Sequence, residues 1–167
     1  MEIGDLLVKG TIWLSLLAWV AAEWARCTSR GMEPGRGAWT VGALAALGHA
    51  AAAFHFRHGW SQRAALSETA RQTAALTGLD WGGGLYVNYL FLAVWTADAC
   101  WWWLDPATFD RRPRPLDRAV RAYFLFMFVN GTVVFAKGPI RALGTAAALA
   151  VLAAWYRGRS ASPIEHG

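Results

Sequence analysis

Three of the four histidines of the chain lie close together in the stretch GHAAAAFHFRHGW, residues 48–60. Imidazole is a common ligand of divalent metals, and His55 and His58, three residues apart, would project from one face of a helix. Glu68, in the polar segment that follows, could complete the ligand set, and an open position on the metal would activate water or bind oxygen. His49 lies about 9 Å deeper along the helix than His55, so it stands behind this pair. The stretch therefore predicts a candidate metal site.

The same histidines could instead ligate a haem. Two axial ligands normally come from different helices, and the one histidine outside the stretch is His166 near the end of the chain. A haem would therefore need a homodimer, a second ligand other than histidine, or a partner subunit. In either form, this reading makes the protein a metal- or haem-binding membrane enzyme or redox protein.

A structural role for these residues is the main alternative. Consecutive membrane-crossing helices run antiparallel, which puts His55 level with Asn88 and Tyr89 of the next apolar segment. A hydrogen bond from His55 to either side chain would hold the two helices together, and such bonds are worth about 1 kcal/mol or less. In this interpretation His58 is an interfacial residue at a helix end.

A second group of polar side chains is predicted nearer the middle of the membrane. Counting along the antiparallel segments places His49 at the level of Asn130, with Asp98 about 7 Å closer to the cytosol. Polar groups at this depth cost about 2–3 kcal/mol each, so each needs a partner or a function. The group could line a path for protons or small solutes, or it could hold helices together. We expect Asp98 to pair with an arginine of the first or third loop.

Five apolar segments carry these side chains, at residues 6–25, 38–56, 85–104, 119–136 and 142–156. About 20 residues of helix cross a bilayer, and the fifth segment is short and rich in alanine. The sequence therefore predicts an all-α, polytopic transmembrane bundle of four or five spans. The spacing of alanines and leucines after span two predicts a short surface helix between spans two and three, ended by Gly78. Lys9 and Glu23, near the ends of the first segment, are expected to reach the membrane surface.

The composition supports a membrane protein. Of the 167 residues, 56% are hydrophobic and 16% are charged, whereas about a quarter of a soluble domain is charged. The net charge of +5 could indicate nucleic acid, but the basic residues lie in loops between the apolar segments. Lipid headgroups explain that placement better, so we expect the lipid bilayer and no nucleic acid as a partner. Residues 1–167 are expected to form a single integral membrane domain.

The distribution of basic residues predicts the orientation. With five spans, ten of the sixteen lysines and arginines lie on the side of the first and third loops and the C-terminus, and six lie on the other. The ten are Arg26, Arg30, Arg36, Arg111, Arg112, Arg114, Arg118, Arg121, Arg157 and Arg159. The six are Lys9, Arg57, Arg63, Arg71, Lys137 and Arg141. Because cytoplasmic loops carry the excess of positive charge, we expect an inner-membrane protein with its N-terminus outside and its C-terminus in the cytoplasm.

The tryptophans are expected to form belts at the two membrane surfaces. The inner belt would hold Trp24, Trp39, Trp101, Trp102, Trp103 and Trp155, and the outer belt Trp60 and Trp81.

No catalytic set stands out, and the sequence leaves open whether the protein is an enzyme. The alanine-rich stretches ALAALGHAAAA and ALGTAAALAVLAA would let other helices approach closely. The leading hypothesis is therefore a non-catalytic subunit or accessory protein of a membrane complex, with protein partners or a second copy bound through those faces. The metal- or haem-binding protein and the proton or small-solute path are the alternatives.

Overall fold

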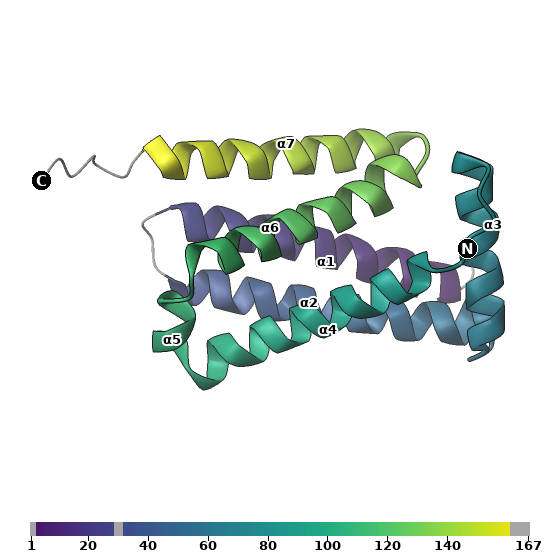
Figure 1. Cartoon of the computed structure of the whole chain (residues 1–167), viewed down its shortest axis with the longest axis horizontal. Helices are drawn as coiled ribbons and strands as arrows, with labels where there is room; N and C mark the ends of the chain where they lie inside the picture. The colour runs from purple at the N-terminus through teal and green to yellow at the C-terminus, as the bar shows by residue number, and fades with distance from the viewer. Residues whose placement is uncertain (1–2, 29–31, 161–167) are drawn as a thin grey trace, which may run out of the picture.

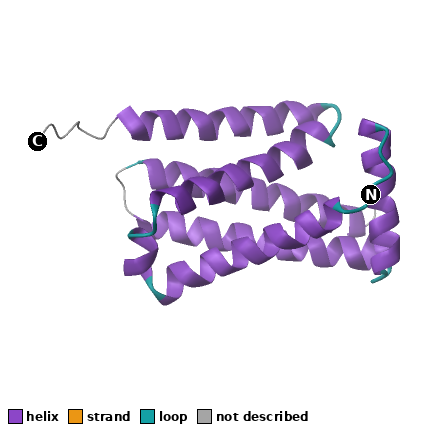
Figure 2. Ribbon diagram, in the orientation of Figure 1, coloured by secondary structure: helices purple, strands orange, loops and turns teal. Residues whose placement is uncertain are grey.

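The computed structural model describes residues 3–28 and 32–160, with side chains from residue 33 to residue 157 in the second range, and shows only helices and connecting loops in them (Figure 2). Arg30 and His166, and the side chain of Arg159, lie outside the described part. The elements in chain order are α1 (Ile3–Cys27), α2 (Met32–His58), α3 (Gln62–Thr77), α4 (Gly84–Leu104), α5 (Pro106–Asp110), α6 (Arg114–Val129), the π-helical turn η1 (Asn130–Val134) and α7 (Pro139–Ser160). The all-α class predicted from the sequence is confirmed.

Five helices form a closed ring, in which each helix is antiparallel to the next along the ring except where α7 meets α1. Contacts connect α1 to α2, α2 to α4, α4 to α6, α6 to α7, and α7 back to α1. In Figure 1, α1, α4 and α7 run in one direction, and α2 and α6 run in the other. The short helix α5 closes the end at which α1, α4 and α7 finish and α6 begins, and we call this the α5 end. Helix α3 lies across the opposite end, which we call the α3 end.

Helix α3 is the short helix that the sequence predicts between the second and third apolar segments. It begins where the Ser61 hydroxyl accepts a hydrogen bond from the Ala64 N–H, and it ends at Gly78, whose φ of 77° is left-handed. This conformation carries little penalty only for glycine, and the Gly78 N–H caps the carbonyl of Ala74. Ala65 is buried and α3 packs on α2 and α4. The alanine face of α3 therefore packs against protein, as its composition predicts.

Aromatic side chains fill the centre of the ring. Trp19 of α1 stacks on Phe128 of α6 with their ring centroids 4.5 Å apart. Trp39 of α2 stacks on Phe124 of α6 at 4.8 Å, and Trp95 of α4 contacts Phe124 edge-on at 5.0 Å. All five side chains are buried. Because four of the five ring helices contribute to this cluster, its packing fixes how they are arranged around the centre.

Gly42 allows three of these helices to interlock. A Cβ atom at this position would lie 2.5 Å from Cζ2 of Trp95, so the indole ring occupies the space a side chain would need. On the other side, the hydroxyl of the buried Ser15 donates a hydrogen bond of 3.1 Å to the Gly42 carbonyl. Part of the small-residue face of α2, including the buried Ala43 and Ala46, is therefore used inside this chain.

Three described helices are long and apolar enough to cross a membrane: α1, α2 from Glu33, and α7 up to Arg157. The alanine-rich α7, which the sequence left as the doubtful fifth span, is among them. Only some of the tryptophans predicted for the two belts face outward. Trp24 and Trp103 are exposed, but Trp39 and Trp102 are buried, so their placement at an interface was wrong. Each of these two indoles packs on aromatic rings of neighbouring elements instead of facing outward.

Candidate functional site

A cluster of buried and half-buried charges lies at the α5 end of the ring. We call it the charge network, and its members are Glu23, Arg26, Asp98, Arg112, Asp117 and Arg121. Three carboxylates face three guanidinium groups, so the formal charges cancel. The residues come from α1, α4, α6 and the loop between α5 and α6.

Glu23 is the most deeply placed of these charges. Its side chain is 0% exposed, so the expectation that it reaches the membrane surface was wrong. One carboxylate oxygen accepts a hydrogen bond of 3.2 Å from Arg26, one turn further along α1. The other accepts a hydrogen bond of 2.6 Å from the indole N–H of Trp155 in α7. The carboxylate faces a neighbouring helix that supplies a donor, which removes the need for it to reach water.

Asp117, in the first turn of α6, joins the network together. Its Oδ1 accepts a hydrogen bond of 2.8 Å from Nη2 of Arg26 and one of 2.9 Å from Nε of Arg112. Arg112 Nη2 also contacts this oxygen, and Arg121 Nε lies 3.3 Å from Oδ2. Burial alone would raise the pKa of Asp117, but the hydrogen bonding from Arg112 and the charges of Arg121 and Arg26 hold it below its ordinary value.

Asp98 pairs with Arg112, whose Nη1 donates a hydrogen bond of 2.7 Å to it. Arg112 belongs to the third loop, so the predicted partner of Asp98 is confirmed. Both side chains are buried. The pair connects α4 to the chain that leads into α6.

The short helix α5 puts Arg112 in place. Asp105 begins it by accepting a hydrogen bond from the N–H of Thr108, and Pro106 occupies the first turn. Phe109 then stacks on Trp102 with ring centroids 4.5 Å apart and planes 8° from parallel. The guanidinium of Arg112 lies 4.3 Å from the centroid of the Phe109 ring, a favourable cation–π contact. The loop DPATFDRRPRPLD thus turns back over the end of the ring and points Arg112 inward.

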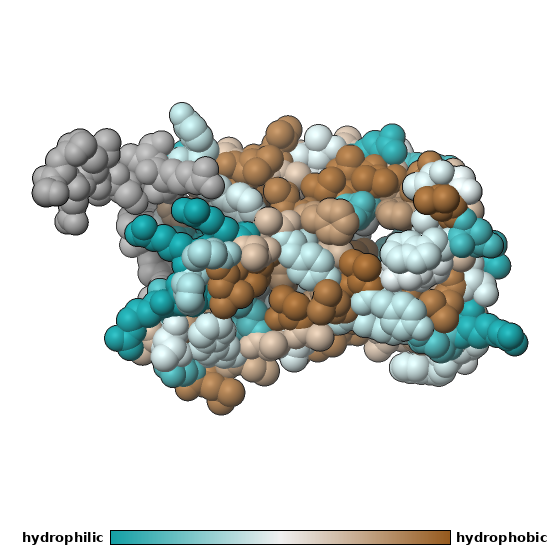
Figure 3. Space-filling model, viewed as in Figure 1, coloured by the Kyte–Doolittle hydropathy of each residue, from teal (hydrophilic) through white to brown (hydrophobic). Residues whose placement is uncertain are grey.

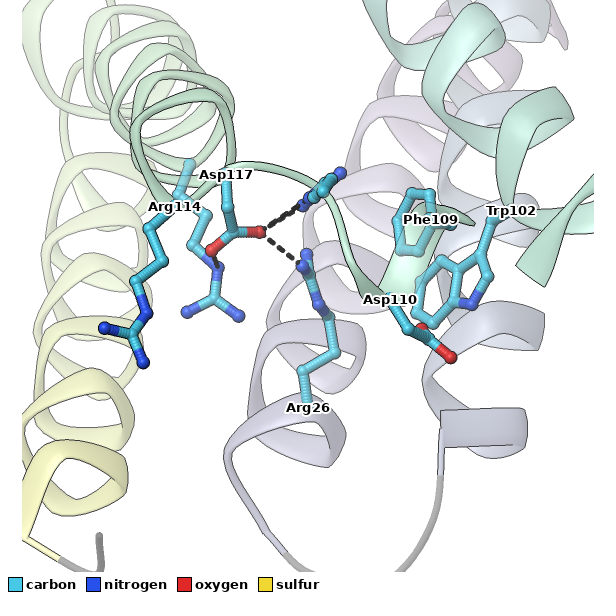
Figure 4. Close-up of a pocket in the computed structure, with 8 residues that line it drawn as sticks. Arg26, Trp102, Phe109, Asp110, Arg114 and Asp117 are labelled. Carbon is cyan, nitrogen blue, oxygen red and sulfur yellow. Dashed lines mark hydrogen bonds and ion pairs between the residues drawn. The ribbon is translucent and has the colours of Figure 1, made fainter. Parts of the chain in front are cut away.

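A pocket of about 280 Å³ opens beside the charge network. Its lining residues are Arg26, Trp102, Phe109, Asp110, Arg112, Arg114, Asp117 and Arg121. Figure 4 shows Asp117 between the arginines on one side of the pocket and the stacked Trp102 and Phe109 on the other. The pocket therefore has a charged wall and an aromatic wall.

The predicted metal ligands are only partly brought together, at the α3 end. His58 and Glu68 line one pocket of about 500 Å³. His55 is exposed and is not among the residues that line this pocket, and its Nδ1 accepts a hydrogen bond of 3.2 Å from the indole of Trp60. Glu68 is bound by Arg71 and by Gln72. Hydrogen bonding from Arg71 first, and then from Gln72, lowers its pKa. The described part of the chain contains no group of three or more His, Cys, Asp or Glu side chains that could hold a metal ion.

The predicted partners of His55 on α4 have other contacts. Tyr89 donates a hydrogen bond of 2.5 Å to Gln62 of α3, and its ring faces Phe54 rather than His55, at 6.3 Å between centroids. Asn88 is exposed. The structure thus joins α2, α3 and α4 at this end through Phe54, Tyr89 and Gln62.

The predicted mid-membrane group is spread over the ring. Nδ1 of His49 lies 2.8 Å from the carbonyl oxygen of Val8 in α1. Because a carbonyl can only accept, His49 Nδ1 carries the proton. Asn130 begins η1, where its carbonyl accepts a bond from the N–H of Phe135, and η1 packs on α6 and α7. Asp98 pairs with Arg112. His49, Asn130 and Asp98 therefore each have different partners.

Sequence reasoning identified Asp98 but missed the remainder of the charge network. Two signals were available in the residue spacing. Glu23 and Arg26 are separated by one helical turn, as are Asp117 and Arg121, and both pairs lie where an apolar segment meets a basic loop. Such pairs usually stay in water, so only the packing of α1 against α7 shows that Glu23 is buried.

The charge network can clamp helices, and the pocket beside it can hold an ion. With six groups mutually paired, the network connects α1, α4, α6 and α7 at one end of the ring. Comparison with known proteins adds no further assignment, because no protein family matches the chain and no curated protein or solved structure is similar to it.

Proposed function

We propose that this protein is a multi-pass inner-membrane protein in which all five ring helices cross the bilayer, and that it acts as a non-catalytic subunit or accessory protein of a membrane complex. The orientation follows the distribution of basic residues, with the N-terminus outside and the α5 end in the cytoplasm. Three observations on the ring support this proposal.

The first observation is that the outside of the ring carries large apolar side chains. Each ring helix turns at least one large apolar side chain outward. These side chains, all more than half exposed, are Leu17, Leu44, Leu90, Phe126 and Leu149. Figure 3 shows apolar residues over the middle of one face and polar ones gathered at the two ends. A helix that is apolar all round belongs in a large core or in a membrane, and no second layer of helices covers the ring within residues 3–28 and 32–160. This observation carries the membrane placement.

The second observation is the closure of the ring. If α1, α2 and α7 cross the membrane, α4 and α6 must lie at the same depth, because they connect α2 to α7 around the ring. Residues 84–97, in α4, and residues 122–136, which run from α6 through η1, contain no charged residue. At 1.5 Å per residue, the 21 residues of α4 extend about 31 Å, which matches a hydrocarbon core of about 30 Å.

The third observation concerns glycines on the outer surface. Gly10 in α1 and Gly37 in α2 are exposed, and no atom lies within 4 Å of the position a Cβ would take. Glycine inside a helix costs about 1 kcal/mol relative to alanine, and nothing within the described residues requires it here. A second helix packed closely on these positions would require glycine, because small residues allow two helix backbones to approach in a membrane. The proposed partner contacts are therefore at Gly10 and Gly37.

The experiment compares Gly37→Leu with Val41→Leu, a control one turn away on the same exposed face. Each variant is extracted from its native membranes in a mild detergent, and its mass is measured by native mass spectrometry. We expect the wild type and Val41→Leu to carry a protein partner or a second copy, and Gly37→Leu to appear as the 18.3 kDa monomer. A wild type that is monomeric in every mild detergent contradicts the accessory role.

The metal- or haem-binding alternative and the path alternative have less support. His55 does not line the pocket that His58 and Glu68 share, and its ring contacts Trp60 instead. Stacked aromatic rings occupy the centre of the ring, where a path would have to run. Metal analysis and an absorption spectrum of the wild type and His55→Ala would test the first, and proteoliposome flux in Asp98→Asn the second.

A further inference from the structure

We propose that the pocket at the α5 end binds a phosphate-bearing anion, held chiefly by Arg114 and Arg121. The lining of the pocket, the contacts of its arginines and its position in the ring support this assignment. The anion binding does not depend on the accessory role proposed above; only the choice of a lipid as its source depends on the membrane placement.

The pocket presents a positive surface. Four of its lining residues are arginines and two are aspartates, which leaves a formal charge of +2 on the wall. The carboxylates that balance this charge are Glu23 and Asp98. Both are buried behind the wall, where they accept hydrogen bonds from Arg26 and Arg112. An ion entering the pocket therefore meets guanidinium groups first.

Arg114 and Arg121 have bonding capacity left for a ligand. Arg26 and Arg112 donate hydrogen bonds of 2.7 to 3.2 Å to the network carboxylates. Arg121 contacts Glu23 and Asp117 through its buried Nε, at 3.5 and 3.3 Å and without hydrogen-bond geometry, and its side chain also interacts with Cys27. Its Nη groups donate no hydrogen bond to a carboxylate among the described residues. No hydrogen bond or ion pair connects Arg114 to any described residue. Guanidinium groups bind phosphate through two parallel N–H donors, which makes phosphate the best match to this wall.

The opposite wall is aromatic, formed by Trp102 and Phe109. The pocket of about 280 Å³ has room for about nine waters at roughly 30 Å³ each, so a phosphate group and the carbon atoms attached to it can enter. The arginines would hold the charge and the rings would cover the carbon chain. A phosphomonoester or phosphodiester fits these two walls better than a bare inorganic ion does.

Two sources can supply this chemistry: the headgroup of an anionic phospholipid, or a soluble phosphate compound. Basic pockets between helices at the cytoplasmic surface are suited to anionic headgroups. The residues that line the pocket come from the ends of α1 and α4, from α5, from the loop after it and from the start of α6. The proposed orientation puts this α5 end at the cytoplasmic surface. The experiment therefore includes one arm for each source.

The full chain is purified in a neutral detergent and its thermal unfolding is followed in two titrations. One adds inorganic phosphate against chloride of equal ionic strength, and the other adds phosphatidylglycerol against phosphatidylcholine. Native mass spectrometry counts the lipid molecules retained. We expect Arg114→Gln to weaken binding about tenfold, the loss expected for a charge-assisted hydrogen bond. Arg118→Gln, four residues further along α6 and outside the pocket, serves as the matched control and should bind as the wild type does.

Asp110→Asn is a second variant that keeps the test decisive if Arg114→Gln folds poorly. Asp110 is exposed on the rim and lines the pocket, so removing its negative charge should tighten binding. A shift with phosphatidylglycerol alone supports a lipid ligand, and a shift with both additives supports a soluble phosphate compound. The proposal is overturned if neither additive shifts unfolding, or if Arg114→Gln, Arg118→Gln and Asp110→Asn all bind equally.

Discussion

At the scale of single residues, the buried pair of Asp98 and Arg112 shows how this chain keeps charges in an apolar bundle. A buried ion pair contributes little compared with two apolar residues, because both charges lose their hydration. Removing one partner is a different matter, since it leaves the other charge buried and unpaired. We therefore expect the intact pair to add little stability of its own and the loss of either partner to be costly.

Arg112→Met is expected to destabilise the protein by about 3–5 kcal/mol, because Asp98 and Asp117 both lose a buried partner. The double variant Asp98→Leu with Arg112→Met should regain part of that loss. Arg57→Gln, which breaks the half-exposed pair with Asp5 at the α3 end, is the control and should cost less than about 1 kcal/mol. Thermal or denaturant unfolding in detergent measures all three. An Arg112→Met variant as stable as Arg57→Gln would contradict the burial of the network.

Asp117 predicts how stability depends on pH. Its pKa is lower in the folded protein than in the unfolded chain, so its stabilising effect is present above the unfolded value of about 3.9 and is lost as pH falls through the folded value. As the pH is lowered below about 4, the unfolding temperature of the wild type should decrease. Asp117→Asn should be less stable at neutral pH and should lose less on acidification.

The control for this pH dependence is Asp105→Asn. The Asp105 carboxyl is fully exposed, and the Thr108 N–H lowers its pKa at the start of α5. This variant should keep the acid dependence that Asp117 causes. If wild type and Asp117→Asn respond identically to acid, the ionised Asp117 does not hold the network together.

At the scale of helices, hydropathy identified the elements, and the structure corrects their ends. The predicted segment 38–56 became Met32–His58, and 119–136 became Arg114–Val129 followed by Asn130–Val134. Helices continue past the apolar stretch because backbone hydrogen bonding does not stop where the membrane does. The π-helical turn η1 was not predicted, because hydropathy depends on composition and one extra residue in a turn does not change composition.

The charge network could not be predicted in the same way. Which side chains meet depends on the order of helices around the ring, and the sequence contains no direct record of that order. Asp98 was identified because one carboxylate in an apolar segment needs a partner. Glu23 was misplaced because it lies near a segment end, where reaching water is the usual solution.

Gly42→Ala tests the interlocking of α1, α2 and α4. The added Cβ would lie 2.5 Å from the buried Trp95 ring, so we expect a loss of about 1–3 kcal/mol from overpacking. Gly48→Ala is the matched control in the same helix, where the nearest side-chain atom, on Thr11, is 3.8 Å away. It should be neutral or stabilising by up to about 1 kcal/mol. Equal unfolding temperatures for the two variants would contradict the packing of Trp95 on Gly42.

At the scale of the whole molecule, the ring is apolar on both surfaces and charged at both ends. The centre is filled with stacked aromatic rings, the outer surface carries exposed leucines, and the charges gather in the network at one end and around α3 at the other. This arrangement suits a bilayer, which covers the middle of the ring and leaves both ends in water.

The central claim is that α4 and α6 cross the membrane together with α1, α2 and α7. If only the last three crossed, the loop before α4, the α5 loop and the loop before α7 would all lie on the same side. With five spans, the α5 loop is the one of these three loops that lies in the cytoplasm. Three exposed positions report on these loops, at Asp80, Ala107 and Lys137.

The most direct measurement is labelling of single cysteines with a thiol reagent that cannot cross the membrane. Cys27 and Cys100, the two free cysteines, are first replaced by serine, and Asp80→Cys, Ala107→Cys or Lys137→Cys is then introduced. With the outer membrane made permeable and the inner membrane intact, Asp80→Cys and Lys137→Cys should be labelled, and Ala107→Cys only after the inner membrane is opened. Labelling of Ala107→Cys together with the other two, before that step, would contradict the five-span ring.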